Sequence, residues 1–144
     1  MGSLVARMPV EEHGIYEDYE YYITFNVMYA HFCAYVKIPE NHPYYKKKLD
    51  QLEVLVRLDS CMINWAETED EGFFIGWSYN EHWHGVDLER LYKYDPEHWD
   101  KIQKECVTNK SHWANYRAGP PVQIEKVQED VRNVIMQLKN AEKK

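Results

Sequence analysis

The sequence predicts an α+β fold: an antiparallel sheet of about four to six strands, one or two short helices, and a long C-terminal helix packed on the sheet. Two observations lead to this class. Apolar and polar residues alternate in several stretches before residue 80, as they do in half-buried strands. Apolar residues then recur every three or four positions between residues 124 and 138, as on one face of a helix. With 144 residues, of which 44% are hydrophobic, the chain is expected to form a single domain over residues 1–144.

The first two expected strands form a hairpin within residues 19–38. Residues 21–29 and residues 32–38 both alternate aromatic or β-branched side chains with other residues, which is typical of strands. Pro39 ends the second strand, because proline offers no N–H group to a ladder. The acidic residues ahead of the hairpin predict a flexible, solvated lead-in over residues 1–18.

Two further strands are expected after the hairpin. Apolar residues at positions 54, 56 and 58 predict a third strand that continues toward Trp65. An acidic turn over residues 67–72 follows it. Alternation from Phe73 to Tyr79 then predicts a fourth strand, in which Gly76 allows another group to approach closely.

Helices are expected around this sheet, with a first short turn over residues 49–52. One or two helical turns are expected over residues 88–94, and Asp95 is a predicted N-cap for a helix from Pro96 to about Val107. The C-terminal helix opens after two prolines and frays over residues 140–144. Its apolar stripe consists of Ile124, Val127, Val131, Val134, Ile135 and Leu138.

Composition excludes several classes of protein. The chain has 17 Lys and Arg against 24 Asp and Glu, a net charge of −7, which argues against binding to duplex DNA or RNA. No apolar run approaches the 18 residues of a membrane span, so no membrane partner is expected. Three cysteines are an odd number at wide spacings, which favours free thiols and a cytoplasmic location.

Aromatic residues are unusually abundant, with 12 tyrosines and 5 tryptophans. A single core of this size has too little room for all of them. The sequence therefore predicts a homo-oligomer, either a dimer or a multiple of a dimer.

Arginines are scarce, and two of them suggest a site for a small phosphorylated, nucleotide-like ligand. Arg57 lies in an apolar stretch and needs a partner, either Asp59 or a ligand phosphate, and Arg117 follows a group of aromatic and amide residues. Arginine grips phosphate and an aromatic ring stacks on a base. The alternative is an oligomer contact, because the same residue types are common at interfaces. The predicted ligand-binding residues are Arg57, Trp77, Tyr79, His82, His84, Trp113, Tyr116 and Arg117.

His82 and His84 also form a His-x-His pair, which points both rings the same way in an extended segment. Asp87, His98 or His112 would complete a metal site. The alternative, two surface histidines beside a packed Trp83, is favoured, so no metal and no cofactor are expected.

The loop over residues 39–48 contains two prolines and three consecutive lysines. One interpretation is a rigid grip for an anion made by His42, Tyr45 and Lys47. The alternative is a turn whose lysines are solvated above Tyr44 and Tyr45. No nucleophile or nucleotide-loop motif occurs anywhere in the chain, so no catalytic residue is predicted and the protein is expected not to be an enzyme.

The same loop carries a resemblance. Cys33–Lys47 resembles the segment GYV-x-x-P-x-x-H-P-x-Y-x-K of a widespread family of small phage and prophage proteins, and Phe73–Trp77 stands where that family has WW-x-GFD. The chain departs from the family at Val56–Asp59, which lacks the glycines of V-H-G-G-L-T, and after Gly76, where GFDCAH is replaced. No general activity is assigned to the family, so the resemblance implies a phage origin and a bacterial cytoplasm but no catalytic residue.

Three functions follow from these observations. The first is a non-enzymatic protein that sequesters a small anionic, nucleotide-derived signal of bacterial antiviral defence. The second is a phage inhibitor that binds a host enzyme by mimicking nucleic acid, which the acidic residues within 11–20 and 67–71 favour. The third is a metal-dependent hydrolase that uses His82 and His84.

Overall fold

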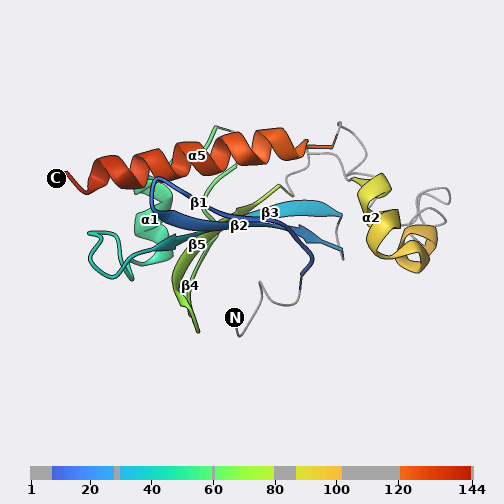
Figure 1. Cartoon of the computed structure of the whole chain (residues 1–144), viewed down its shortest axis with the longest axis horizontal. Helices are drawn as coiled ribbons and strands as arrows, with labels where there is room; N and C mark the ends of the chain where they lie inside the picture. The colour runs from blue at the N-terminus through green and yellow to red at the C-terminus, as the bar shows by residue number, and fades with distance from the viewer. Residues whose placement is uncertain (1–7, 28–29, 60, 80–86, 102–120, 144) are drawn as a thin grey trace.

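Five strands form one antiparallel sheet in the order β1-β2-β3-β5-β4, and helix α5 lies along one face of it (Figure 1). This structure is a computed structural model that describes residues 8–27, 30–59, 61–79, 87–101 and 121–143. The strands are β1 Val10–Tyr16, β2 Tyr19–Asn26, β3 His31–Ile38, β4 Trp65–Glu69 and β5 Gly72–Ser78. The helices are α1 Leu49–Leu55, α2 Leu88–Tyr94 and α5 Ile124–Ala141. The predicted α+β class is confirmed.

The main core lies between α5 and the sheet. Alternation along β2 and β3 places Ile23 opposite Ala34 and Phe25 opposite Phe32, and all four side chains are buried. The predicted apolar stripe of α5 is buried against them from Val127 to Leu138. The predicted hairpin within residues 19–38 is therefore confirmed, as are the strand from Phe73 and the C-terminal helix.

The second face of the sheet has a smaller apolar cluster. Cys33, Tyr35 and Phe74 are buried there, with Tyr22 and Trp65 packed against them. Gly76 is required at this point, because a Cβ atom on it would lie 2.6 Å from Cδ1 of Tyr35. The predicted close approach at Gly76 is therefore explained by the ring of Tyr35.

Residues 10–16 form strand β1, so the prediction of a flexible lead-in is wrong for this segment. Its acidic side chains are bound rather than solvated. Glu12 accepts hydrogen bonds from the hydroxyl of Tyr21 at 2.5 Å and from the amide of Gln128 at 2.6 Å. Glu11 pairs with Arg90 and accepts a hydrogen bond from the hydroxyl of Tyr94 at 2.8 Å. These contacts join β1 to α2 and α5.

The predicted third strand over positions 54–58 is also wrong. The backbone N–H of Lys48 donates to the side chain of Gln51 at 3.2 Å, and the helix α1 that begins there continues to Leu55. Leu52 and Val56 are buried while Val54 is 65% exposed, whereas a strand would place all three side chains on one face. Beyond α1 only an isolated bridge joins Arg57 to Met62, and β4 begins at Trp65.

The remaining helices agree with the sequence where the structure describes them. The side chain of Asp87 caps α2 by accepting from the backbone N–H of Arg90 at 3.1 Å. Residues 96–101 are helical, and the rest of the helix predicted to Val107 lies outside the described residues. Helix α5 extends to Ala141, two residues into the predicted frayed tail. In the part of the chain that the structure describes, no helix is long and apolar enough to cross a membrane.

Candidate binding site

A pocket of about 400 Å³ opens at the end of the sheet where its turns meet. Antiparallel pairing brings the β1–β2 turn, the end of β3 and the β4–β5 turn to this end, since Val36 lies opposite Tyr21 and Ile38 lies opposite Phe73. The pocket is lined by Asp18, Glu20, Lys37, Ile38, Pro39, Glu40, Tyr45, Glu71, Gly72 and Phe73.

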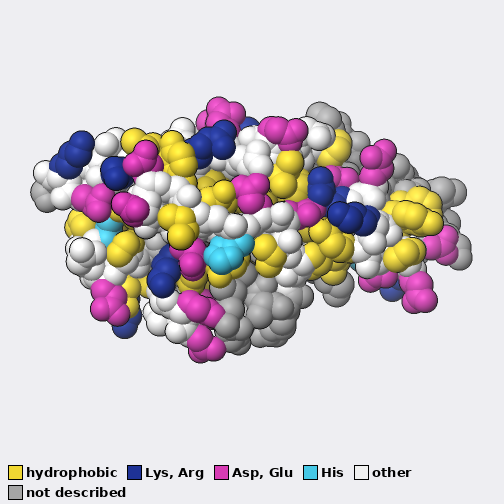
Figure 2. Space-filling view, viewed as in Figure 1, with side chains coloured by type: hydrophobic (Ala, Val, Ile, Leu, Met, Phe, Trp, Pro, Cys, Tyr) yellow, Lys and Arg dark blue, Asp and Glu magenta, His cyan; other side chains and the backbone are white. Residues whose placement is uncertain are grey.

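The charge of this pocket is mainly negative, because its lining contains four carboxylates and a single ammonium group, that of Lys37. Asp18 and Glu20 come from the first acidic stretch of the sequence, and Glu71 comes from the second, about fifty residues later. In Figure 2 acidic side chains (magenta) lie at the lower end of the molecule, at the tip of β4. Like charges around a concave surface raise the local negative potential, which favours a positively charged ligand.

Aromatic rings form one wall of the pocket. Tyr45 is half-buried and packs edge-to-face on Phe73, with ring centroids 5.7 Å apart and an interplanar angle of 71°. The ammonium group of Lys46 lies 5.6 Å from the ring centroid of Tyr45. The ring of Tyr45 thus already contacts a cation. Rings beside carboxylates suit organic cations such as guanidinium, which stack as well as pair.

Gly72 shapes the floor of the pocket. Its φ angle of +139° is a backbone conformation that side chains disfavour. A Cβ atom there would lie 2.6 Å from Cε of Lys37, so the glycine also leaves room for the aliphatic part of that lysine. The side chain of Lys37 can therefore lie against the β4–β5 turn.

The carboxylates of the pocket affect the pKa of a neighbouring tyrosine, Tyr22. Burial is the main cause that raises the pKa of Tyr22, and the negative charges of Glu20 and Glu71 raise it further. His13 stacks on the ring of Tyr22 with centroids 4.1 Å apart, and its Nε2 lies 3.5 Å from Glu20. The negative potential therefore extends from the pocket onto the second face of the sheet.

The structure does not gather these carboxylates at one point. Among the residues it describes, no group of three or more His, Cys, Asp or Glu side chains is placed to hold a metal ion. An extended cation that contacts several carboxylates in turn suits this arrangement better than a small ion.

Trp77 and Tyr79, predicted to stack on a ligand, lie in the main core, and this part of the prediction is wrong. Each is only 1% exposed. The indole N–H of Trp77 donates to the hydroxyl of Tyr79 at 2.9 Å, and that hydroxyl donates to Asp130 of α5 at 2.6 Å. Burial, followed by the hydrogen bond and charge of Asp130, raises the pKa of Tyr79. These side chains attach α5 to the sheet.

Arg57 is exposed rather than enclosed by apolar neighbours. Its Nε–H donates to the carbonyl of Val54 at 3.2 Å, within the turn that ends α1. Asp59, its predicted partner, instead accepts from the ammonium group of Lys126 at 2.9 Å. The premise that Arg57 must be paired in an apolar strand is therefore wrong.

Five of the predicted ligand-binding residues lie outside the described part of the chain: His82, His84, Trp113, Tyr116 and Arg117. The pairing of the two histidines and the aromatic loop around Arg117 stay predictions. Of the other residues of the metal hypothesis, Asp87 caps α2, and His98 donates its backbone N–H to Asp95 at 3.1 Å. His112 also lies outside the described residues.

His42 of the predicted anion grip is a buried structural residue. Its Nδ1 accepts the backbone N–H of Tyr44 at 2.9 Å, so the ring hydrogen is on Nε2, which donates to the carbonyl of Leu138 at 2.7 Å. Leu138 lies in the last turn of α5, where carbonyls have no helical partner. His42 therefore caps α5, and a role for it in holding an anion is wrong.

Of the other two residues of the predicted anion grip, Tyr45 lines the acidic pocket, and Lys47 is half-buried in the same loop.

Replacing His42 with alanine should lower the melting temperature by roughly 5 °C, because a buried helical carbonyl loses its donor. Thermal unfolding followed by circular dichroism measures this. Asn41→Ala is the matched control, because the neighbouring Asn41 is exposed. Equal melting temperatures for the two variants would show that the cap does not stabilise the protein.

The two acidic stretches that line the pocket are visible in the sequence, but their meeting is not. Two hairpins place residues 17–20 and 70–73 at the ends of strands, and adjacent pairing of the hairpins would bring both turns to one end. What was missing was the pairing of β3 with β5, which is a contact between distant segments.

Comparison with known proteins returned no match: no protein-family model fits the chain, and neither curated proteins nor solved structures show significant similarity to it.

Proposed function

We propose that this is a non-enzymatic binding protein whose acidic pocket receives a positively charged side chain of a partner protein. The observation that carries the proposal is that Asp18, Glu20, Glu40 and Glu71 all line one concave site with an aromatic wall. Arginine is the side chain that fits best, since its guanidinium group both pairs with carboxylates and stacks on Tyr45.

The phage origin implied by the resemblance suggests which partner protein the pocket would bind, namely a host protein that handles nucleic acid. Proteins that handle nucleic acid present arginine and lysine to phosphates. A small acidic protein that offers carboxylates in place of phosphates would occupy such a surface and inhibit it. The net charge of −7 supports this function, because it accelerates encounter with a basic partner.

Sequestration of an anionic nucleotide-derived signal is supported less by the described residues. The pocket would repel phosphate, and Trp77 and Tyr79 are enclosed in the core. What favours this function is the local positive charge of residues 100–144, which contain nine Lys and Arg and six Asp and Glu. The structure leaves much of this segment undescribed.

The test is titration with N-acetyl-arginine amide, followed by NMR and by calorimetry in low salt. We expect the backbone signals of Lys37, Glu71 and Gly72 to shift. The variant Asp18→Lys/Glu40→Lys should bind about tenfold more weakly, because each partly exposed pair contributes up to about 1 kcal/mol. Added salt should weaken the wild type.

The matched control is Glu89→Lys/Glu97→Lys. These residues are also exposed, and this variant changes the net charge by the same amount away from the pocket. Equal weakening by both variants would mean that overall charge, and not the pocket, attracts the cation. Calorimetry with a panel of cyclic dinucleotides, cyclic trinucleotides and ADP-ribose derivatives tests the competing hypothesis of sequestration. If one of these binds below about 100 μM while the arginine amide does not, sequestration replaces the present proposal.

A further inference from the structure

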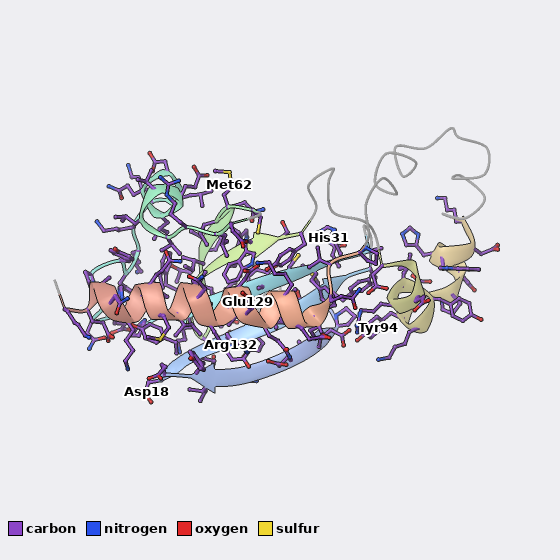
Figure 3. All side chains as sticks on the ribbon, turned by 90° about the horizontal axis from the view of Figure 1, so that it is seen from above. Asp18, His31, Met62, Tyr94, Glu129 and Arg132 are labelled. Atoms are coloured by element: carbon purple, nitrogen blue, oxygen red, sulfur yellow. The ribbon has the colours of Figure 1, made fainter. Side chains whose placement is uncertain are left out.

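Strand β1 forms one edge of the sheet. It pairs with β2 alone among the described strands, and the sheet order places it opposite the other edge, β4. Figure 3 shows β1 along one rim of the molecule, ending near Asp18, with no described helix or strand outside it. Such an edge offers backbone groups to any strand that can approach.

The turn that joins β1 to β2 shows which backbone groups face outward. Glu17 and Asp18 have φ angles of 50° and 69°, as in a two-residue hairpin turn, so the flanking pair of Tyr16 and Tyr19 is hydrogen-bonded. Hydrogen-bonded pairs alternate along an antiparallel ladder. Gly14 therefore bonds to β2, whereas the N–H and C=O groups of His13 and Ile15 point away from the sheet.

This part of the edge lacks the usual protection. Residues 13–16 contain no lysine, proline or acidic residue, and the side chain of Ile15 is 71% exposed. The other edge, β4, carries Glu67 and Glu69 within five residues. Charged residues keep edges from pairing. The acidic residues of β1, Glu11 and Glu12, lie before this segment, whereas those of β4 reach its last residue.

We propose that β1 pairs antiparallel with β1 of a second copy of this chain, around a two-fold axis at Gly14. This pairing joins two five-stranded sheets into one. His13 of one copy lies opposite Ile15 of the other, and these two pairs are the hydrogen-bonded ones, so all the outward groups of both residues gain partners. A register shifted by one residue would place Gly14 opposite His13 or Ile15. The backbone groups of Gly14 face β2, so that pair could not form its hydrogen bonds.

Two features of the strand fit this register. Gly14 lies on the axis, so neither copy places a side chain of its own there, and a Cβ atom would be 2.8 Å from the hydroxyl of Tyr21. In this register Glu17 lies opposite Glu11 of the second copy, and Asp18 lies opposite Val10. Glu11 is already paired with Arg90, which offsets its charge where it faces Glu17.

Sedimentation equilibrium tests the assembly. We expect a mass of twice 17.4 kDa for the wild type. Ile15→Pro removes an N–H group that faces outward, and Ile15→Lys places a charge on the edge, so both should sediment at 17.4 kDa while keeping their circular dichroism. Thr68→Pro is the matched control, because by the same alternation Thr68 faces outward from the other edge, and it should leave the dimer intact.

Hydrogen exchange by NMR tests the register. The amides of His13 and Ile15 should be protected only at dimer-forming concentrations, whereas those of Gly14 and Tyr16 are protected in the monomer too. A wild-type mass of 17.4 kDa at concentrations up to about 100 μM would overturn the proposal. So would a dimer that survives Ile15→Lys, or one in which the amides of His13 and Ile15 exchange at the monomer rate.

Discussion

Replacing Ile135 with aspartate should unfold the protein at room temperature. Ile135 is 0% exposed and lies in the middle of the α5 stripe that covers the sheet. Moving an unpaired carboxylate into this core costs several kcal/mol beyond the lost apolar burial, which is comparable to the whole stability of a domain of this size. Loss of the cooperative melting transition, followed by circular dichroism, measures the effect.

Met136→Asp is the control for this experiment. Met136 is the next residue of the same helix, but it is 38% exposed. The two variants share the introduced residue and nearly the same helix position, so only the direction of the side chain differs. A folded, soluble Ile135→Asp variant with the melting temperature of the control would mean that α5 does not cover the sheet.

Replacing Asp130 with alanine should lower the free energy of unfolding by about 3 kcal/mol, because its partners stay behind in or near the core. Asp130 is buried, accepts from the hydroxyl of Tyr79 and lies 3.0 Å from the ammonium group of Lys126. Without the carboxylate, the buried hydroxyl of Tyr79 loses its acceptor. Urea unfolding followed by tryptophan fluorescence measures the loss.

A double-mutant cycle with Tyr79→Phe separates this network from a general effect of changing the helix. In the Tyr79→Phe background Asp130→Ala should cost less, since the hydroxyl that loses its acceptor is already absent. Glu129→Ala is the control, because the adjacent Glu129 is exposed. Strictly additive effects of the two core substitutions would show that the hydrogen bond contributes nothing to stability.

Elements with strong local periodicity could be predicted from the sequence. The hairpin of β2 and β3 alternates aromatic and β-branched residues, and α5 repeats apolar residues at helical spacing, so each pattern admits one interpretation. Both are confirmed because the same periodicity that forms the element also defines its buried face.

Strand β1 could not be predicted, because its acidic residues are stabilised by distant partners. Glu11 and Glu12 are typical of a solvated segment until Arg90 and Gln128, far along the chain, are known to contact them. Helix α1 failed for another reason. The apolar residues at positions 54 and 56 alternate as they would in a strand. The seven residues of α1 are too few to show a helical repeat against that pattern.

The site residues show the same limit. Alternation places Trp77 and Tyr79 on one face of β5, but it cannot say whether that face meets a ligand or a helix. Here it meets α5. The carboxylates of the pocket were visible as two acidic stretches, and only the pairing of β3 with β5 brings those stretches together.

The position of α5 after every strand has a consequence for synthesis of the chain. The apolar face made by β2, β3 and β5 is covered by residues 124–141, which emerge from the ribosome only after the whole sheet has been made. At about 5–20 residues per second, the finished strands wait on the order of seconds with that face open to water. Nascent chains of this protein are therefore expected to need a holding chaperone, and to fold cooperatively only after α5 has emerged, when His42 can reach Leu138.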